Sequence, residues 1–305
     1  MNAPAGGGTP GGFGRTILER LGRPLRVGGI DYLNSRPLIE GLLETFGDGI
    51  ELGNWVPSEL ARRLRIGLLD AALVPVVEYF RGPEDYRVVP GVAIASYGAV
   101  ESIRFYHRRP LVEVARIGLD ASSLTSSLLV RLLFAAQWSP GRPEPEMLAL
   151  PPEAGQAALR GDGGDPDVDA VLLIGDAALG SPAPPGWRMV DLGTEWTRRT
   201  GLPFVYAFWV YRGPAVPGLA EAFRRSRDIG TARIDAIVER GPLPPGMSVA
   251  EARRYLHKVI QFDLGPAQVE GLLEFWSAAR AQGLLGSMRE SELRFVDGGC
   301  GGDRS

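Results

Sequence analysis

Short apolar runs alternate with stretches whose apolar residues recur at helical spacing from residue 25 onward. This alternation is typical of a mostly parallel sheet that lies between layers of helices. Residues 25–30 are predicted as a strand and residues 31–36 as a polar loop, and Pro37 fits the first turn of a helix that runs towards Phe46. The pattern therefore predicts an α/β protein.

The same order of elements returns later in the chain. Residues 116–119 are predicted as a strand, residues 120–123 as a polar loop and residues 125–138 as an apolar helix. Each unit is followed by a short strand that begins with an aspartate, Asp70 in the first and Asp169 in the second. We interpret this as a weak internal repeat of two α/β units that face one another across a cleft.

The expected crossovers between the two units lie near residues 100–104 and 202–207, where the chain changes between loop and extended apolar sequence. The first lobe is then discontinuous. Three further helices are predicted towards the C-terminus. The predicted segments are a flexible tail at 1–23, lobe 1 at 24–102 plus 205–290, lobe 2 at 103–204, a flexible tail at 291–305, and helices at 218–240, 249–262 and 266–282.

Composition and charge exclude several classes of function. The 305 residues suffice for two modest cores, and 45% hydrophobic and 23% charged residues are ordinary for a folded protein. The net charge of −3 comes without any basic stripe, so no nucleic-acid partner is expected. The first twenty-odd residues lack the apolar stretch of a secretory signal, and no apolar run is long enough to span a membrane. We expect a cytoplasmic protein without membrane contact.

Metal and redox chemistry find little support. Cys300 is the single cysteine, so no disulfide can form within the chain, and only His107 and His257 could supply imidazole ligands. His107 stands among three arginines and is expected to be solvated. Motifs for a nucleophile elbow, a phosphate loop, a zinc protease and a dinucleotide site are missing. We expect neither a metal nor a cofactor.

Two clusters of small polar residues stand at predicted helix starts, where backbone amides and the helix dipole favour a bound anion. Asn34 and Ser35 form the first cluster, and Thr125 and Ser126 belong to the second. The alternative is that these side chains only cap the helices. Both interpretations stay open for each cluster.

Further candidates lie at the predicted crossovers and strand ends. Ser96, Gly98 and Ser102 occupy the first crossover, where a ligand close to the backbone favours small residues. Asp176 follows a predicted buried strand and serves either the cleft or a helix cap. Tyr206 offers an aromatic face to a ring-shaped ligand, although a core strand explains it equally well.

Specific motifs make the chain resemble the chorismate dehydratases of the futalosine route to menaquinone. They cover about residues 25–285 and are GIDYLNSRPL (29–38), VPVVEY (74–79), SYGAVES (96–102), LDASSLTS (119–126), IGDAAL (174–179), DLGTEW (191–196) and TGLPFVYAFW (200–209). The related dihydroxynaphthoate synthases have a different start, Ser-Pro-Cys-Pro-Asn-Asp, and are expected to use a histidine base. The resemblance implies the two-lobed fold of type II solute-binding proteins and loss of water from chorismate without a cofactor.

The resemblance also implies roles for individual residues. Asn34 and Ser102 match family motifs at the hinge face, and we expect them to hydrogen-bond the substrate near its carboxylates or its leaving hydroxyl. Ser35, Ser96, Gly98, Thr125, Ser126, Asp176 and Tyr206 are the expected substrate-binding residues. Two bases remain open, namely Asp176 and the enolpyruvyl carboxylate of the substrate itself. A cytoplasmic solute-binding or sensory protein for an aromatic or dicarboxylic acid is the competing hypothesis, and both monomer and homodimer stay open.

Overall fold

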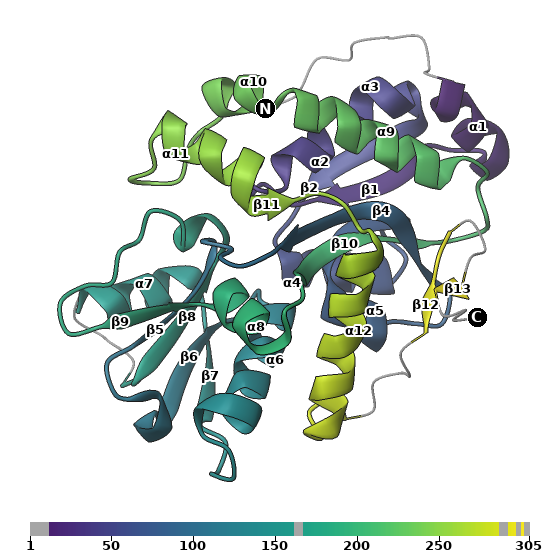
Figure 1. The fold of residues 1–305 in the computed structure, drawn as a ribbon. Helices are drawn as coiled ribbons and strands as arrows, with labels where there is room; N and C mark the ends of the chain where they lie inside the picture. The colour runs from purple at the N-terminus through teal and green to yellow at the C-terminus, as the bar shows by residue number, and fades with distance from the viewer. Residues whose placement is uncertain (1–11, 162–166, 287–291, 297–299, 302–305) are drawn as a thin grey trace.

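The computed structural model describes residues 12–161, 167–286, 292–296 and 300–301. Two sheets, each accompanied by helices, form two lobes that lie side by side (Figure 1). The α/β class and the two-lobed architecture predicted from the sequence are confirmed.

The first lobe is built on a six-stranded sheet with the order β11-β4-β10-β3-β1-β2. Its strands are β1 (Leu25–Gly29), β2 (Ile50–Asn54), β3 (Ala71–Pro75), β4 (Tyr86–Ser96), β10 (Phe204–Arg212) and β11 (Ile260–Gln261). Strand β1 runs parallel to β2 and β3, whereas β10 is antiparallel to β3 and β4. The lobe therefore joins an early and a late segment of the chain.

The second lobe holds a five-stranded sheet with the order β7-β6-β8-β5-β9. Its strands are β5 (Ile103–His107), β6 (Arg116–Asp120), β7 (Glu146–Leu150), β8 (Ala170–Ile174) and β9 (Arg188–Asp191). The chain enters this sheet between Ser96 and Ile103, and it returns to the first sheet between Asp191 and Phe204.

Helices cover both sheets (Figure 1). Those of the first lobe are α1 (Gly12–Leu21), α2 (Arg36–Glu40), α3 (Leu42–Phe46), α4 (Pro57–Arg65), α5 (Val76–Arg81), α9 (Leu219–Ala232), α10 (Ile234–Arg240), α11 (Val249–Arg254) and α12 (Pro266–Ala281). Those of the second lobe are α6 (Leu124–Leu133), α7 (Pro152–Arg160) and α8 (Leu192–Thr200). Single π-helical turns follow α6 at Phe134–Trp138 and α11 at Tyr255–Val259, and 3₁₀ turns lie at Gly47–Gly49, Leu111–Glu113 and Gly175–Ala177. The terminal segments add a short pair of strands, β12 (Leu293–Arg294) and β13 (Cys300–Gly301).

The predicted internal repeat is confirmed by the register of the strands. Val27 of β1 pairs with Ala71 of β3, and Ile117 of β6 pairs with Ala170 of β8. In both units an aspartate directly precedes the second strand, Asp70 before Ala71 and Asp169 before Ala170. The Asp70 carboxylate accepts a hydrogen bond from the Arg26 amide of β1 at 2.9 Å, and the Asp169 carboxylate accepts one from the Arg116 amide of β6 at 3.2 Å. We call this arrangement the aspartate clasp.

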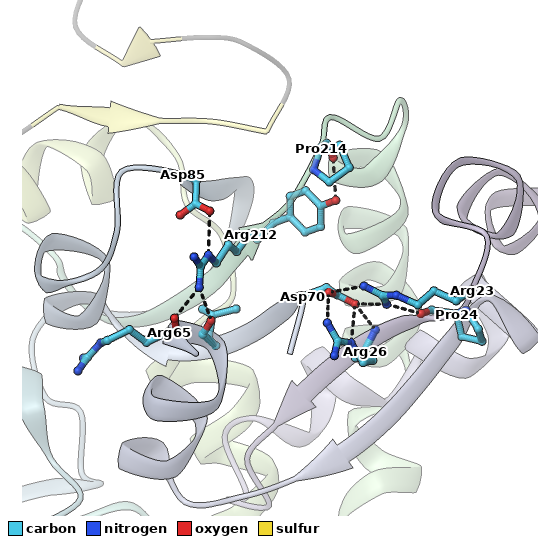
Figure 2. A network of polar contacts seen from close by, with 10 residues as sticks. Arg23, Pro24, Arg26, Arg65, Asp70, Asp85, Arg212 and Pro214 are labelled. Atoms are coloured by element: carbon cyan, nitrogen blue, oxygen red, sulfur yellow. Dashed lines mark hydrogen bonds and ion pairs between the residues drawn. The ribbon is translucent and has the colours of Figure 1, made fainter. Parts of the chain in front are cut away.

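Arginine side chains complete each clasp. Arg23 and Arg26 both bind the Asp70 carboxylate in the first lobe, as Figure 2 shows, and Arg109 binds Asp169 in the second. Burial disfavours the charged form of Asp70, but the hydrogen bonds from Arg23 and Arg26 prevail and lower its pKa to about 2. Arg212 makes a separate contact to Asp85 close by (Figure 2).

The predicted tails need a correction where the structure describes them. Helix α1 lies within the segment predicted as a flexible N-terminal tail, and its Ile17 is buried. A side chain at Gly14 would collide with the carbonyl oxygen of Phe46, so the close approach of this helix depends on glycine. At the other end Leu293 is fully buried. Residues 1–11, 291, 297–299 and 302–305 of the predicted tails lie outside the described residues.

Four predicted helices are also interrupted. The predicted helix from Pro37 towards Phe46 breaks at Gly41 into α2 and α3. The predicted helix at 249–262 changes after α11 to a π-helical turn and then to strand β11 at Ile260–Gln261. The predicted helix at 218–240 breaks at Arg233 into α9 and α10. Gly230, near the end of α9, lies against the backbone of Pro37, and a Cβ atom at this position would be 1.7 Å from the Pro37 carbonyl oxygen. The predicted helix at 125–138 changes to a π-helical turn after Leu133. The close approach of Gly230 to Pro37 joins distant segments, and helical periodicity does not reveal such contacts. None of the described helices has the length and apolar character that crossing a membrane demands.

Candidate active site

The carboxyl ends of the parallel strands in both lobes converge on one cavity. Ile30 follows β1, Pro75 ends β3 and Ile174 ends β8, and all three line the cavity, which measures about 540 Å³ with its opening to solvent. Ligand sites in α/β proteins favour this edge of the sheet. Its polar lining residues are Tyr32, Asn34, Ser102, Ser122, Ser123, Thr125, Ser126 and Tyr206.

The cavity offers neutral donors and apolar walls. Ile94, Ile103 and Leu124 contribute apolar surface, and no Arg, Lys, His, Asp or Glu is among the described residues that line it. A carboxylate bound here would be held by hydroxyls, an amide and backbone N–H groups. The described part of the chain also contains no cluster of three His, Cys, Asp or Glu side chains that could hold a metal ion.

Asn34 and Ser102 come from distant segments and both line the cavity. The Asn34 side-chain amide donates a hydrogen bond to the hydroxyl of Tyr255, at 3.2 Å. Tyr255 is fully buried behind them, and the sequence interpretation did not include it. A tyrosine in an apolar helical segment gives no local signal, because core packing explains it as well.

Thr125 and Ser126 lie at the start of α6 and line the cavity. Ser123 takes the N-cap position but makes no side-chain capping hydrogen bond, so the capping alternative does not account for the hydroxyls here. The Thr125 hydroxyl accepts a hydrogen bond from the Val77 amide of the first lobe, at 3.4 Å. The first turn of α6 therefore forms part of the cavity wall.

Three other candidates lie outside the cavity wall. The buried Ser35 hydroxyl donates to a carbonyl of its own loop, at Ile30 or Tyr32, and also accepts from the Tyr32 amide. Ser96 shares a 2.9 Å hydrogen bond with the Tyr206 hydroxyl, and the Gly98 amide donates to the Thr197 hydroxyl. Gly98 has a φ of 81°, a conformation that glycine adopts at no steric cost. These residues shape the loops that carry the site and do not reach the cavity themselves.

Asp176 connects the two lobes. Its carboxylate accepts a hydrogen bond from the Leu33 amide of the first lobe at 2.9 Å, and burial raises its pKa. It is not among the residues that line the cavity, although the adjacent Gly175 is. Tyr206 does line the cavity, but its hydroxyl is turned to Ser96, so the ring is the part that a ligand would meet.

Asp120 was missed by the sequence interpretation. One oxygen of this buried carboxylate accepts hydrogen bonds from the Ser122 amide and hydroxyl, at 2.8 and 2.6 Å, and the other has no hydrogen-bond partner among the described residues. Burial raises its pKa. An aspartate at the end of a strand before two serines is a weak signal for such a turn. His107, expected in solvent, is buried instead, with its Nδ1 atom 2.7 Å from the carbonyl of Arg109.

Comparison with known proteins identifies the family of this chain. A family model described as menaquinone biosynthesis matches residues 25–281, which is most of the chain. The chain belongs to the menaquinone-biosynthesis family. This family range includes every cavity residue and ends where α12 ends.

One relative that is similar in sequence is named chorismate dehydratase. This protein of Thermus thermophilus is 31% identical over 250 residues, which span 76% of this chain and 83% of the relative. Protein AF1704 from Archaeoglobus fulgidus is structurally similar, with a TM-score of 0.68, 19% identity and coverage of 86% and 98% of the two chains. The periplasmic aliphatic sulphonate binding protein SsuA from Escherichia coli gives a TM-score of 0.58 at 15% identity, with 85% and 86% covered. These structures confirm the periplasmic-binding-protein-like fold for this member of the menaquinone-biosynthesis family.

Proposed function

We propose that this chain is a chorismate dehydratase, which converts chorismate to 3-[(1-carboxyvinyl)oxy]benzoate and water on the futalosine route to menaquinone. The observation that carries the proposal is the family match over a chain whose cavity is lined by neutral hydrogen-bond donors and apolar side chains. The relative named chorismate dehydratase supports the choice of substrate.

The cavity suits a ring that carries two carboxylates. One carboxylate would bind near Asn34, and the other would meet the hydroxyls of Thr125 and Ser126 and the first amides of α6. The ring would lie against Tyr206 and the isoleucine side chains of the wall. Clamping at both ends fixes the ring relative to the reacting atoms, which lowers the entropic part of the barrier.

The reaction needs positioning more than a strong catalyst. Removal of the proton at ring carbon C3 leaves charge that spreads through the ring alkene into the ring carboxylate, where neutral donors stabilise it. The hydroxyl then leaves from C4 as water after it has taken up a proton, and the ring becomes aromatic. Asn34 and Ser102 are the proposed donors to a carboxylate or to the leaving hydroxyl.

The enolpyruvyl carboxylate of the substrate is the base that fits the site best. No carboxylate of the described residues lines the cavity, and Asp176 uses one oxygen for the Leu33 amide of the opposite lobe. A carboxylate that enters with the substrate shares the cavity with the C3 proton, and a bound conformation that brings the two within hydrogen-bond distance supplies the general base.

The decisive experiment mixes purified protein with chorismate and follows the products by liquid chromatography and mass spectrometry. We expect an aromatic product lighter by one water, formed faster than in a control without protein. Asn34→Ala should lower kcat/KM by about 100-fold, the usual effect of removing one donor from a site of this kind. Asn54→Ala, which changes an exposed asparagine of β2, serves as the matched control and should leave the rate unchanged.

A binding protein without turnover is the second candidate. The cavity wall contains no carboxylate or imidazole among the described residues, and SsuA, which shares the fold, is described as a binding protein. Chorismate that binds to the protein and remains unchanged would establish this alternative and contradict the dehydratase.

A further inference from the structure

The turn that carries Ser102 has an uncommon backbone conformation. The Ser102 amide donates a hydrogen bond to the Val100 carbonyl at 2.7 Å, and Glu101 between them has a φ of 60°. A hydrogen bond that spans two residues, with a positive φ at the central one, is typical of the rare and strained form of the γ-turn. Since Ser102 lines the cavity, this strained turn places a proposed donor to the substrate.

Asp191 binds the turn from the second lobe. Its carboxylate accepts hydrogen bonds from the Val100 amide at 3.0 Å and from the Glu101 amide at 2.7 Å. The same carboxylate accepts a hydrogen bond from the Thr194 amide at 2.9 Å and so caps α8. One aspartate at the end of β9 therefore binds both the helix that follows it and the crossover that carries Ser102.

Two further contacts join α8 to the same crossover. The Gly98 amide donates to the Thr197 hydroxyl at 2.9 Å. A Cβ atom at Gly193 would lie 2.5 Å from the Gly98 carbonyl oxygen, so the close approach of the helix depends on glycine. Asp191 and Gly193 both belong to the motif at residues 191–196, to which the proposed function assigns no role.

The remaining polar groups of the turn have other partners. The Glu101 carboxylate forms a bidentate ion pair with Arg254 at 2.6 and 2.7 Å, and the Ser102 carbonyl accepts a hydrogen bond from the Gly175 amide at 2.8 Å. A strained conformation persists only where its surroundings hold it in place. Asp191 supplies the side-chain contact that binds the backbone amides of the turn itself.

We propose that Asp191 is a positioning residue that holds Glu101 in its strained conformation and thereby directs Ser102 towards the substrate. The inference rests on the proposed dehydratase function. Without the carboxylate, Glu101 can relax to a negative φ, and this rotation changes the direction of the Ser102 side chain that follows it.

Asp191→Asn tests this inference, because asparagine keeps the size of the side chain and also caps helices well. Its amide has a single acceptor oxygen, so in either orientation the NH₂ group faces a backbone N–H that the carboxylate binds. We expect kcat to fall by about 10-fold to 100-fold while KM changes less than about 3-fold, since a donor matters most as charge develops.

Asp169→Asn is the matched control. The Asp169 carboxylate also accepts hydrogen bonds from two consecutive backbone amides, those of Ala115 and Arg116, but this residue does not line the cavity. The control should lose stability in urea unfolding and keep its kcat.

Two substitutions at Glu101 separate backbone strain from a general loss of stability. Glu101→Gly and Glu101→Ala both remove the ion pair with Arg254, but only glycine adopts a φ of 60° at no steric cost. In the Asp191→Asn background we expect the glycine variant to have a kcat at least about 5-fold above that of the alanine variant. With Asp191 present the two should differ by less than about 2-fold, because the carboxylate then holds the turn in either case.

Equal kcat values for the two Glu101 variants in the Asp191→Asn background, or an Asp191→Asn enzyme with unchanged kcat, would overturn the inference and leave the dehydratase proposal intact. Wild-type protein that leaves chorismate unchanged would instead overturn the proposed function, and this inference with it.

Discussion

Asp120 is a buried carboxylate without a positive partner among the described residues. One carboxylate oxygen accepts hydrogen bonds from the Ser122 amide and hydroxyl and so stabilises the turn that carries Ser122, while the other oxygen has no hydrogen-bond partner among the described residues. Burial raises the pKa, so the folded protein holds this proton to a higher pH than the unfolded chain does. The charged form therefore costs stability, and the cost appears as the pH rises from the unfolded pKa through the folded one.

Asp120→Asn should reveal this cost. The amide oxygen can still accept the hydrogen bonds from Ser122, but no charge forms, so we expect the free energy of unfolding of the variant relative to wild type to increase between pH 4 and pH 8. Urea unfolding at both pH values measures the difference. Asp120→Ala is the control, because it removes the hydrogen bonds and should destabilise the protein at both. A free energy of unfolding of Asp120→Asn that falls relative to wild type between pH 4 and pH 8 would contradict a destabilising charge at Asp120.

Single residues also show what sequence can predict about the site. Asn34 and Ser102 lie in motifs that resemble a known family, and the structure places both at the cavity. Tyr255 could not be found in this way, because its contact with Asn34 joins residues that are 221 positions apart in the chain. Ser35 was named because serine before a helix suits an anion, but its hydroxyl is used by its own loop.

At the level of elements, the aspartate clasps hold the amino ends of neighbouring parallel strands. In the first lobe, the pKa of Asp70 in the folded protein is about 2, well below the pKa of an aspartate in an unfolded chain. A lowered pKa stabilises the fold above the unfolded pKa, and the contribution disappears as the pH falls towards the folded value.

Asp70→Asn should therefore destabilise the protein at neutral pH by about 1–2 kcal/mol, after allowance for the partial exposure of Arg23 and Arg26. We expect the difference from wild type to shrink between pH 4 and pH 2. Thermal or urea unfolding over this range checks it. Asp263→Asn, which changes an exposed aspartate that pairs with Arg227, is the control and should change stability little. A constant difference at every pH would contradict the clasp as an electrostatic contact.

Element types were predicted better than element ends. The apolar runs that became β3 and β8 are buried along their whole length, as strands covered on both faces are, and so their continuous apolar sequence identified them. Near the break between α9 and α10, Gly230 lies against the backbone of Pro37. Contacts between distant segments leave no local pattern, and for this reason helix 218–240 was predicted as continuous.

At the scale of the whole molecule, side-chain hydrogen bonds connect the lobes around the cavity. Asp176 of the second lobe binds the Leu33 amide, and Thr125 binds the Val77 amide. These bonds stabilise the arrangement in which both lobes reach the same ligand, and a ligand that binds both lobes shifts the population further towards it.

Asp176 distinguishes a link between the lobes from a general base. Asp176→Asn keeps an oxygen that can accept from Leu33, so we expect it to retain most of the turnover. Asp176→Ala removes the link, and KM should rise about 5-fold to 10-fold, the loss expected for one hydrogen bond. Steady-state kinetics measures both, and small-angle scattering should show a larger radius of gyration for the alanine variant. A loss of turnover beyond about 100-fold in Asp176→Asn would identify Asp176 as the base.

The two clasps occupy the ends of the strands that point away from the cavity, because the ligand space is formed where those strands finish. The residues that hold the sheets in register are therefore separate from those that touch a ligand. Changes at Asn34, Thr125 or Ser126 can alter what binds while the register of the sheets stays the same. A scaffold divided in this way can acquire a new specificity by substitutions in its loops without first losing its fold.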